Sequence, residues 1–91
     1  MNPIDNNSMV AEIQRFMQQT FSNCTIASQY YPDQVCWKFY ISFVSHTKQY
    51  HINPPQGCCL MNIQAMGETV SFTIILFVED FRKYHAAKLL N

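Results

Sequence analysis

Large apolar side chains alternate strictly with smaller or polar ones over residues 35–44 (VCWKFYISFV), and this alternation most constrains how the chain can fold. Successive side chains of a β-strand point to opposite faces, so the stretch predicts a strand with one face in a core. The residues that would share the buried face are Trp37, Phe39, Ile41 and Phe43. Those that would share the other face are Cys36, Lys38, Tyr40 and Ser42.

The same period of two predicts a strand over residues 69–78 (TVSFTIILFV). One face carries an unbroken apolar row, made of Val70, Phe72, Ile74, Leu76 and Val78. The opposite face starts with the hydroxyl side chains Thr69, Ser71 and Thr73, and then becomes apolar at Ile75 and Phe77. The end of this strand is therefore apolar on both sides.

Helices are predicted near both ends of the chain. Over residues 9–22 an apolar stripe recurs at helical spacing, and Ser8 can cap the helix. The members of the stripe are Met9, Ile13, Phe16, Met17 and Phe21. Residues 79–91 predict the second helix, because Glu79 and Asp80 lie at its positive end and Lys88 lies near its negative end.

Shorter extended pieces fill the rest of the chain. Residues 24–34 predict an extended piece followed by a turn, and 45–48 predict a hairpin turn into a strand over 49–52. Pro54, Pro55 and Gly57 end the strand predicted over 49–52. Residues 58–65 then resume an extended pattern before a turn at 66–68.

These elements predict an α+β fold. We expect an N-terminal helix, an antiparallel sheet of three to four strands, or five if every extended piece pairs, and a C-terminal helix, in a two-layer sandwich. The length of 91 residues suits one domain. We assign residues 1–8 to a flexible lead-in and residues 9–91 to the single α+β domain.

The composition indicates a surface that needs a partner. Hydrophobic residues make up 48% of the chain and charged residues only 13%, about half of the usual fraction near 25%. Apolar patches left exposed on a small domain mark contact surfaces. If both helices cover one face of the sheet, the predicted partner interface on the other face is Tyr40, Val44, Ile75 and Phe77. If each face receives one helix, the monomer buries these residues itself.

The adjacent thiols Cys58 and Cys59 are the sharpest chemical feature, yet they predict no active site. On a strand their side chains leave opposite faces, so they do not suit one metal ion, and a zinc site needs closely spaced pairs. No motif joins a histidine to a cysteine as a base to a nucleophile. We therefore expect no catalytic residue, no metal and no cofactor, and read the cysteines as ordinary strand thiols.

Six basic residues are scattered along the chain, and the net charge is zero, so we expect no nucleic-acid partner. The most apolar window (70–78) is too short to span a bilayer, and the N-terminus lacks a secretory signal, so we expect no membrane partner and an intracellular, cytoplasmic or nuclear location. In such a reducing compartment the four cysteines would remain thiols.

Two short stretches carry resemblances to known families. DFRKYHAAKLL (80–90) resembles the last helix of double-stranded-RNA-binding domains, but the chain lacks the basic loop that precedes it there, so that function is not carried over. YYPD (30–33) and INPP (52–55), placed after a helix and among strands, resemble the arrangement in RWD domains. RWD domains are α+β interaction modules, and this resemblance implies an interaction role.

The sequence thus favours a non-enzymatic interaction module, which either homodimerises or acts as a small subunit of a larger assembly through its sheet. One alternative is a binder of small apolar ligands, with a pocket between helix 9–22 and the sheet lined by Met17, Phe21 and Phe39. Another is an enzyme that uses Cys58 or Cys59 as its nucleophile.

Overall fold

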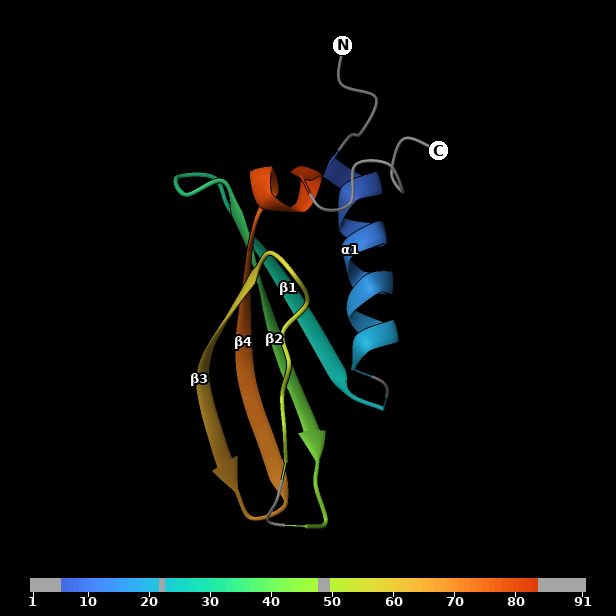
Figure 1. Ribbon diagram of the computed structural model, residues 1–91, viewed down its shortest axis with the longest axis vertical. Coiled ribbons are helices and arrows are strands. Elements are labelled where there is room, and N and C mark those ends of the chain that lie inside the picture. Colours follow the sequence, from blue (N-terminus) through green and yellow to red (C-terminus); the bar gives the residue numbers. More distant parts are fainter. Residues whose placement is uncertain (1–5, 22, 48–49, 84–91) are drawn as a thin grey trace.

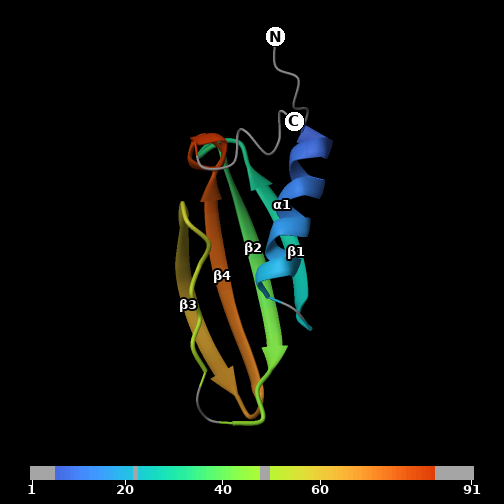
Figure 2. The same cartoon turned by 45° about the vertical axis from the view of Figure 1, so that its right-hand side comes forward.

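The computed structural model describes residues 6–21, 23–47 and 50–83 of the chain. In chain order its elements are α1 (Asn6–Thr20), β1 (Thr25–Tyr31), β2 (Cys36–Val44), β3 (Cys58–Met66) and β4 (Thr69–Phe77). A short helical segment over residues 78–83 follows β4 directly. α1 packs against one face of the sheet (Figures 1 and 2), so the α+β sandwich expected from the sequence is the observed fold.

The four strands lie in the order β1-β2-β4-β3, and every neighbouring pair is antiparallel. β2 and β3 therefore run parallel, with β4 between them. A parallel pair needs a crossover of about a dozen residues or more, and residues 45–57 supply it. The predicted strand over 49–52 is wrong for residues 50–52, which pair with no strand, and residues 48 and 49 lie outside the described part.

The crossover runs over the core face of the sheet. Ile52 packs against the core cluster, and Pro55 is buried. Because proline lacks a backbone donor, Pro54 and Pro55 suit a segment that covers a sheet rather than one that joins it. α1 and the crossover thus lie on the same side of the sheet.

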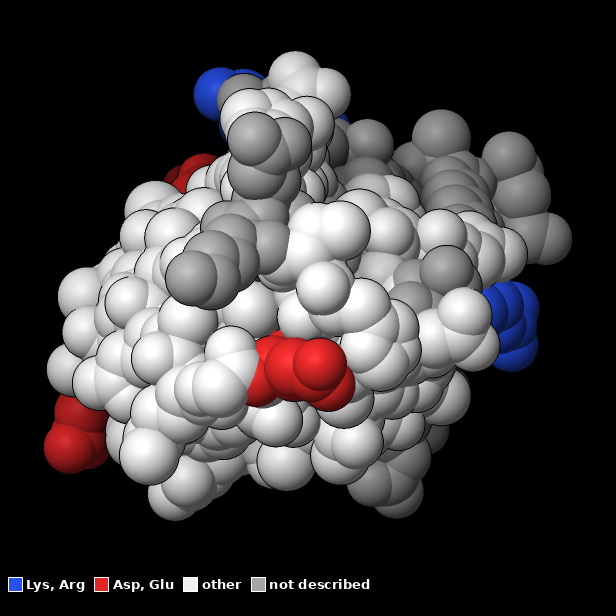
Figure 3. Space-filling model, turned by 90° about the horizontal axis from the view of Figure 1, so that it is seen from below, with Lys and Arg blue, Asp and Glu red and all other residues white. Residues whose placement is uncertain are grey.

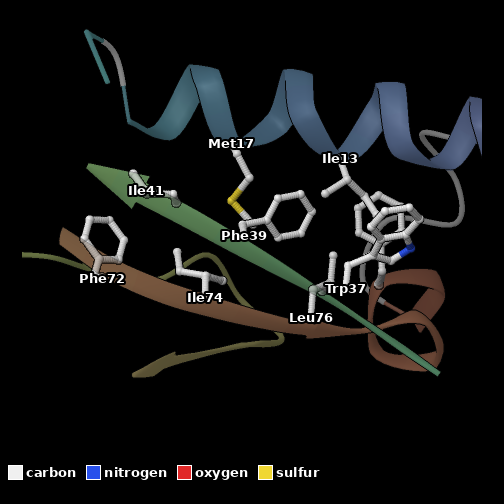
Figure 4. Close-up of a cluster of buried hydrophobic side chains, with 9 residues drawn as sticks. Ile13, Met17, Trp37, Phe39, Ile41, Phe72, Ile74 and Leu76 are labelled. Atoms are coloured by element: carbon white, nitrogen blue, oxygen red, sulfur yellow. The ribbon is translucent and has the colours of Figure 1, made fainter. Parts of the chain in front are cut away.

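The apolar rows predicted for β2 and β4 meet in register and form the core. Trp37 pairs with Leu76, Phe39 with Ile74, and Ile41 with Phe72. α1 adds two fully buried side chains, Ile13 and Met17, which point at this layer in Figure 4. Phe81, from the short helical segment, closes one end of the cluster.

Both predicted helices differ from expectation at their ends. α1 begins at Asn6 rather than at Met9 and ends at Thr20, because an apolar stripe fixes which side of a helix packs but not its first turn. Val10 and Phe21 pack at the rim of the core, and the side chains of Ser8 and Met9 lie outside the described part. Of the helix predicted over 79–91, residues 79–83 are helical, and residues 84–91 are outside the described residues.

The β3–β4 turn, predicted at 66–68, is a two-residue hairpin loop formed by Gly67 and Glu68. Gly67 has a φ of 62°, and a type II′ turn requires such a positive φ at its first central residue. The β1–β2 turn is less regular, since its last residue, Val35, has a φ of 48°.

Candidate interaction surface

No described helix lies on the face of the sheet opposite α1 (Figure 2), which we call the open face. Cross-strand partners share a face, so the register defines its members. From β1 and β2 they are Thr25, Ala27, Gln29, Tyr31, Cys36, Lys38, Tyr40, Ser42 and Val44. From β4 and β3 they are Thr69, Ser71, Thr73, Ile75, Phe77, Cys59, Met61, Gln64 and Met66.

All four residues predicted for the partner interface lie on the open face. Val44 is 57% exposed, Tyr40 and Phe77 are each 39% exposed, and Ile75 is half-buried. They do not form one continuous patch. Ile75 and Phe77 lie toward one end of the sheet, Val44 lies at the other, and Tyr40 stands between them.

Two further large side chains, which the sequence reasoning missed, come from β3. Met66 is 79% exposed, and Met61 is also exposed. Alternation alone could not assign these side chains to a face of the sheet, because β3 carries a bulge. Met61 pairs with Thr73 and Gln64 with Ser71, so β3 has one residue more than β4 between these pairs. The inserted residue shifts the phase of the strand, so Gln64 and Met66 join Cys59 and Met61 on the open face.

The bulge also shapes the surface. Asn62 adopts a φ of 57°, a left-handed conformation that asparagine tolerates better than most residues. Beside it lies a shallow hollow of about 320 Å³, lined on the open face by neutral hydrogen-bonding side chains. These are Tyr40, Ser42, Asn62, Gln64, Ser71 and Thr73. The polar residues Asn62 and Gln64, within an otherwise apolar strand, were the sequence signal for this feature.

A small polar cluster orders the β1 side of the open face. The hydroxyl groups of Tyr31 and Tyr40 are 2.7 Å apart and form a hydrogen bond, and this bond is the main cause that raises the pKa of Tyr40 above its ordinary value. The Lys38 ammonium lies 4.4 Å from the centroid of the Tyr31 ring, within the range of a cation–π contact. Tyr31 thereby contacts both Tyr40 and Lys38.

Charged side chains are rare on the sheet. Lys38 is the only charged residue within β1, β2, β3 and β4, all of which the structure describes. Figure 3, which views the molecule from the end at which the β3–β4 turn lies, likewise shows a few separate charged groups on a largely uncharged surface. The four strands therefore carry no cluster of charges that would attract a strongly charged ligand.

The two adjacent cysteines leave opposite faces, as the strand geometry predicts. Cys58 is half-buried at the rim of the core, and Cys59 is exposed on the open face. Burial, with smaller effects of Cys59 and Asp80, raises the pKa of the Cys58 thiol to about 12. A nucleophile must be a thiolate, so Cys58 is poorly suited to catalysis near neutral pH.

The His46–Glu68 pair is the ion pair of the described residues that involves a histidine. His46 and Glu68 approach within 3.4 Å, but both side chains are well exposed. Among the described residues, no three His, Cys, Asp or Glu side chains come together in a way that could hold a metal ion.

The ligand pocket suggested by the sequence has two of its three residues in the packed core. Met17 and Phe39 are fully buried within the cluster (Figure 4). Phe21 does line a hollow of about 210 Å³, together with Thr20, Cys24, Phe43, His51 and Ile52. This hollow lies at the end of α1, and neither Met17 nor Phe39 borders it.

Comparison of the chain with protein-family models, with curated proteins and with solved structures gives no significant match. None of the helices in the described residues is long and apolar enough to cross a membrane.

Proposed function

We propose that this chain is a non-enzymatic protein–protein interaction module, or a small subunit of a larger assembly, that binds through the open face. One observation carries the proposal: a four-stranded sheet leaves Val44, Tyr40, Phe77 and Met66 exposed on a face that no described helix covers. On the core face of the same sheet, α1, Ile52 of the crossover and Phe81 pack into or against the core cluster.

The chemistry of the open face favours a protein partner. Aromatic and methionine side chains are enriched where proteins meet, and charged residues are depleted there. A nucleic-acid partner would need a cluster of basic side chains, and the four strands carry Lys38 alone. The four free thiols support a location inside a reducing cell.

Site-specific photo-crosslinking in the cells that express the chain would test this proposal. A photoreactive phenylalanine replaces Tyr40 on the open face in one variant and Tyr50 in a control variant. The two tyrosines are matched, with 39% and 41% exposure, but Tyr50 lies on the crossover. We expect a discrete covalent protein adduct from position 40 and none from position 50.

A chain that forms no adduct from position 40 would contradict the proposal. So would equal adducts from both positions, because they would indicate contact without preference for the open face.

A further inference from the structure

The open face is chemically complementary to itself. We propose that a second copy of this chain covers it, with the two sheets packed face to face in a two-fold symmetric dimer. This inference rests on the proposed function and names its partner.

Charge is the first argument for a second copy. A face rich in one sign of charge repels its own copy and selects an opposite partner, whereas the open face carries a single charged group, Lys38. The ammonium of Lys38 is already engaged over the Tyr31 ring, at 4.4 Å from its centroid. Nothing on this face calls for a charged partner.

The neutral polar groups of the open face also suit a second copy. Ser42, Ser71, Thr73 and Gln64, which line the hollow, carry hydroxyl or amide groups that both donate and accept hydrogen bonds. In a two-fold contact each group meets the same set of groups from the other copy. Such a set can satisfy itself, which carboxylates or ammonium groups alone cannot do.

The size of the open face also suits a second copy. Strands spaced about 4.8 Å apart and about nine residues long, at about 3.3 Å per residue, give four strands a face of roughly 19 by 30 Å. A stacked copy would thus bury roughly 600 Å² per partner, the lower end of the range for specific interfaces. We therefore expect a weak, reversible dimer rather than a permanent one.

The edges of the sheet are less suited to pairing than its face. The bulge at Asn62 interrupts the outer edge of β3, and bulges are one device that blocks strand addition. At the other edge α1 runs beside β1, and Gln14 donates a hydrogen bond of 3.2 Å to Ser28. Stacking of two open faces would leave the bulge in β3 and the position of α1 beside β1 unchanged.

Sedimentation equilibrium of the full chain, from about 1 to 300 µM, would test the dimer, since weak protein complexes dissociate in this micromolar range. Tyr40→Lys and Phe77→Lys place charges on the open face, and Tyr50→Lys is the matched control. We expect wild type and Tyr50→Lys to dimerise alike, and each open-face variant to weaken dimerisation at least tenfold. Circular dichroism would verify that all variants remain folded.

A wild-type chain that stays monomeric up to the highest concentration would overturn the dimer. A dimer that both open-face variants leave intact would overturn it as well, because the contact would lie elsewhere. The crosslinked adduct from position 40 separates this inference from the proposed function. An adduct of twice the mass of the chain supports both, an adduct with a different protein alone supports the proposed function but contradicts the dimer, and no adduct contradicts both.

Discussion

The two faces of this sheet are built from the same strands, and they differ in polarity and in the exposure of their large side chains. On the core face Phe39, Ile74 and Leu76 are fully buried under α1. On the open face the neighbouring positions Tyr40 and Phe77 remain exposed. Adjacent residues of one strand can thus contribute very differently to the free energy of unfolding. The difference depends on whether another part of the chain packs over their side chains.

The largest expected effect is a difference in stability between alanine variants at two consecutive residues of β2. Phe39→Ala should lower the free energy of unfolding by about 3–5 kcal/mol, because it removes a buried aromatic side chain and leaves a cavity. Tyr40→Ala should cost about 1 kcal/mol or less, since it removes an exposed ring and one hydroxyl hydrogen bond. Urea unfolding of both variants at low protein concentration would measure the difference, and equal losses would contradict the assignment of the two faces.

The bulge in β3 provides the second test, since it decides which β3 side chains reach the open face. Asn62→Val should destabilise the fold by about 1–3 kcal/mol, because a β-branched residue resists the left-handed conformation found at this position. Asn62→Gly, which accepts a positive φ, should change stability by less than about 0.5 kcal/mol. If valine were tolerated as well as glycine, β3 would not contain this bulge in solution.

Cys58 and Cys59 lie on opposite faces, and their different burial should affect how stability depends on pH. The folded state raises the pKa of Cys58 from an ordinary 9.0 to about 12, so folding favours the protonated thiol. That contribution is complete below pH 9 and is lost as the pH rises toward 12, with a slope below about 1.4 kcal/mol per pH unit, the limit for one proton. Urea unfolding at several pH values should show that Cys58→Ala removes this part of the alkaline destabilisation.

Cys59→Ala is the matched control for that experiment. Its side chain lies on the open face and is exposed, so its removal should leave the contribution of Cys58 in place. An identical pH dependence for wild type and Cys58→Ala would contradict the half-buried position of Cys58.

The smallest effect is expected in the β1–β2 turn, at its last residue, Val35. Val35 combines an exposed side chain with a φ of 48°, which a β-branched residue adopts at a cost. Val35→Asn should therefore stabilise the fold by about 0.5–1 kcal/mol, since asparagine tolerates this conformation. Val44→Asn, at the extended end of β2, should give no such gain. Thermal unfolding of both variants would distinguish them.

Local patterns in the sequence predict much of the fold correctly. The alternation around Trp37 and Phe72 assigns the core rows of β2 and β4, and the stripe through Ile13 and Met17 assigns the packed side of α1. These predictions succeed because a period of two or of 3.6 residues reports burial on one side, independently of which element supplies the cover.

Part of the open face could be predicted for the same reason. Tyr40, Val44, Ile75 and Phe77 follow from alternation within β2 and β4. Met61 and Met66 do not, because a bulge changes the phase of β3 without a strong local signal. The hairpin predicted at 45–52 failed for a related reason, since turn residues at Ser45 and His46 show that the chain bends but not which strand it joins next.

The amino-acid pattern alone thus dictates that this chain forms a sheet with one strongly apolar face and one mixed, nearly uncharged face. Its tertiary structure decides the order β1-β2-β4-β3, the crossover over the core and the exposure of the open face. The physical reason is that side-chain periodicity is a local property, whereas strand order and cover depend on contacts between residues far apart in the chain. Those contacts place both α1 and the crossover on the same side of the sheet.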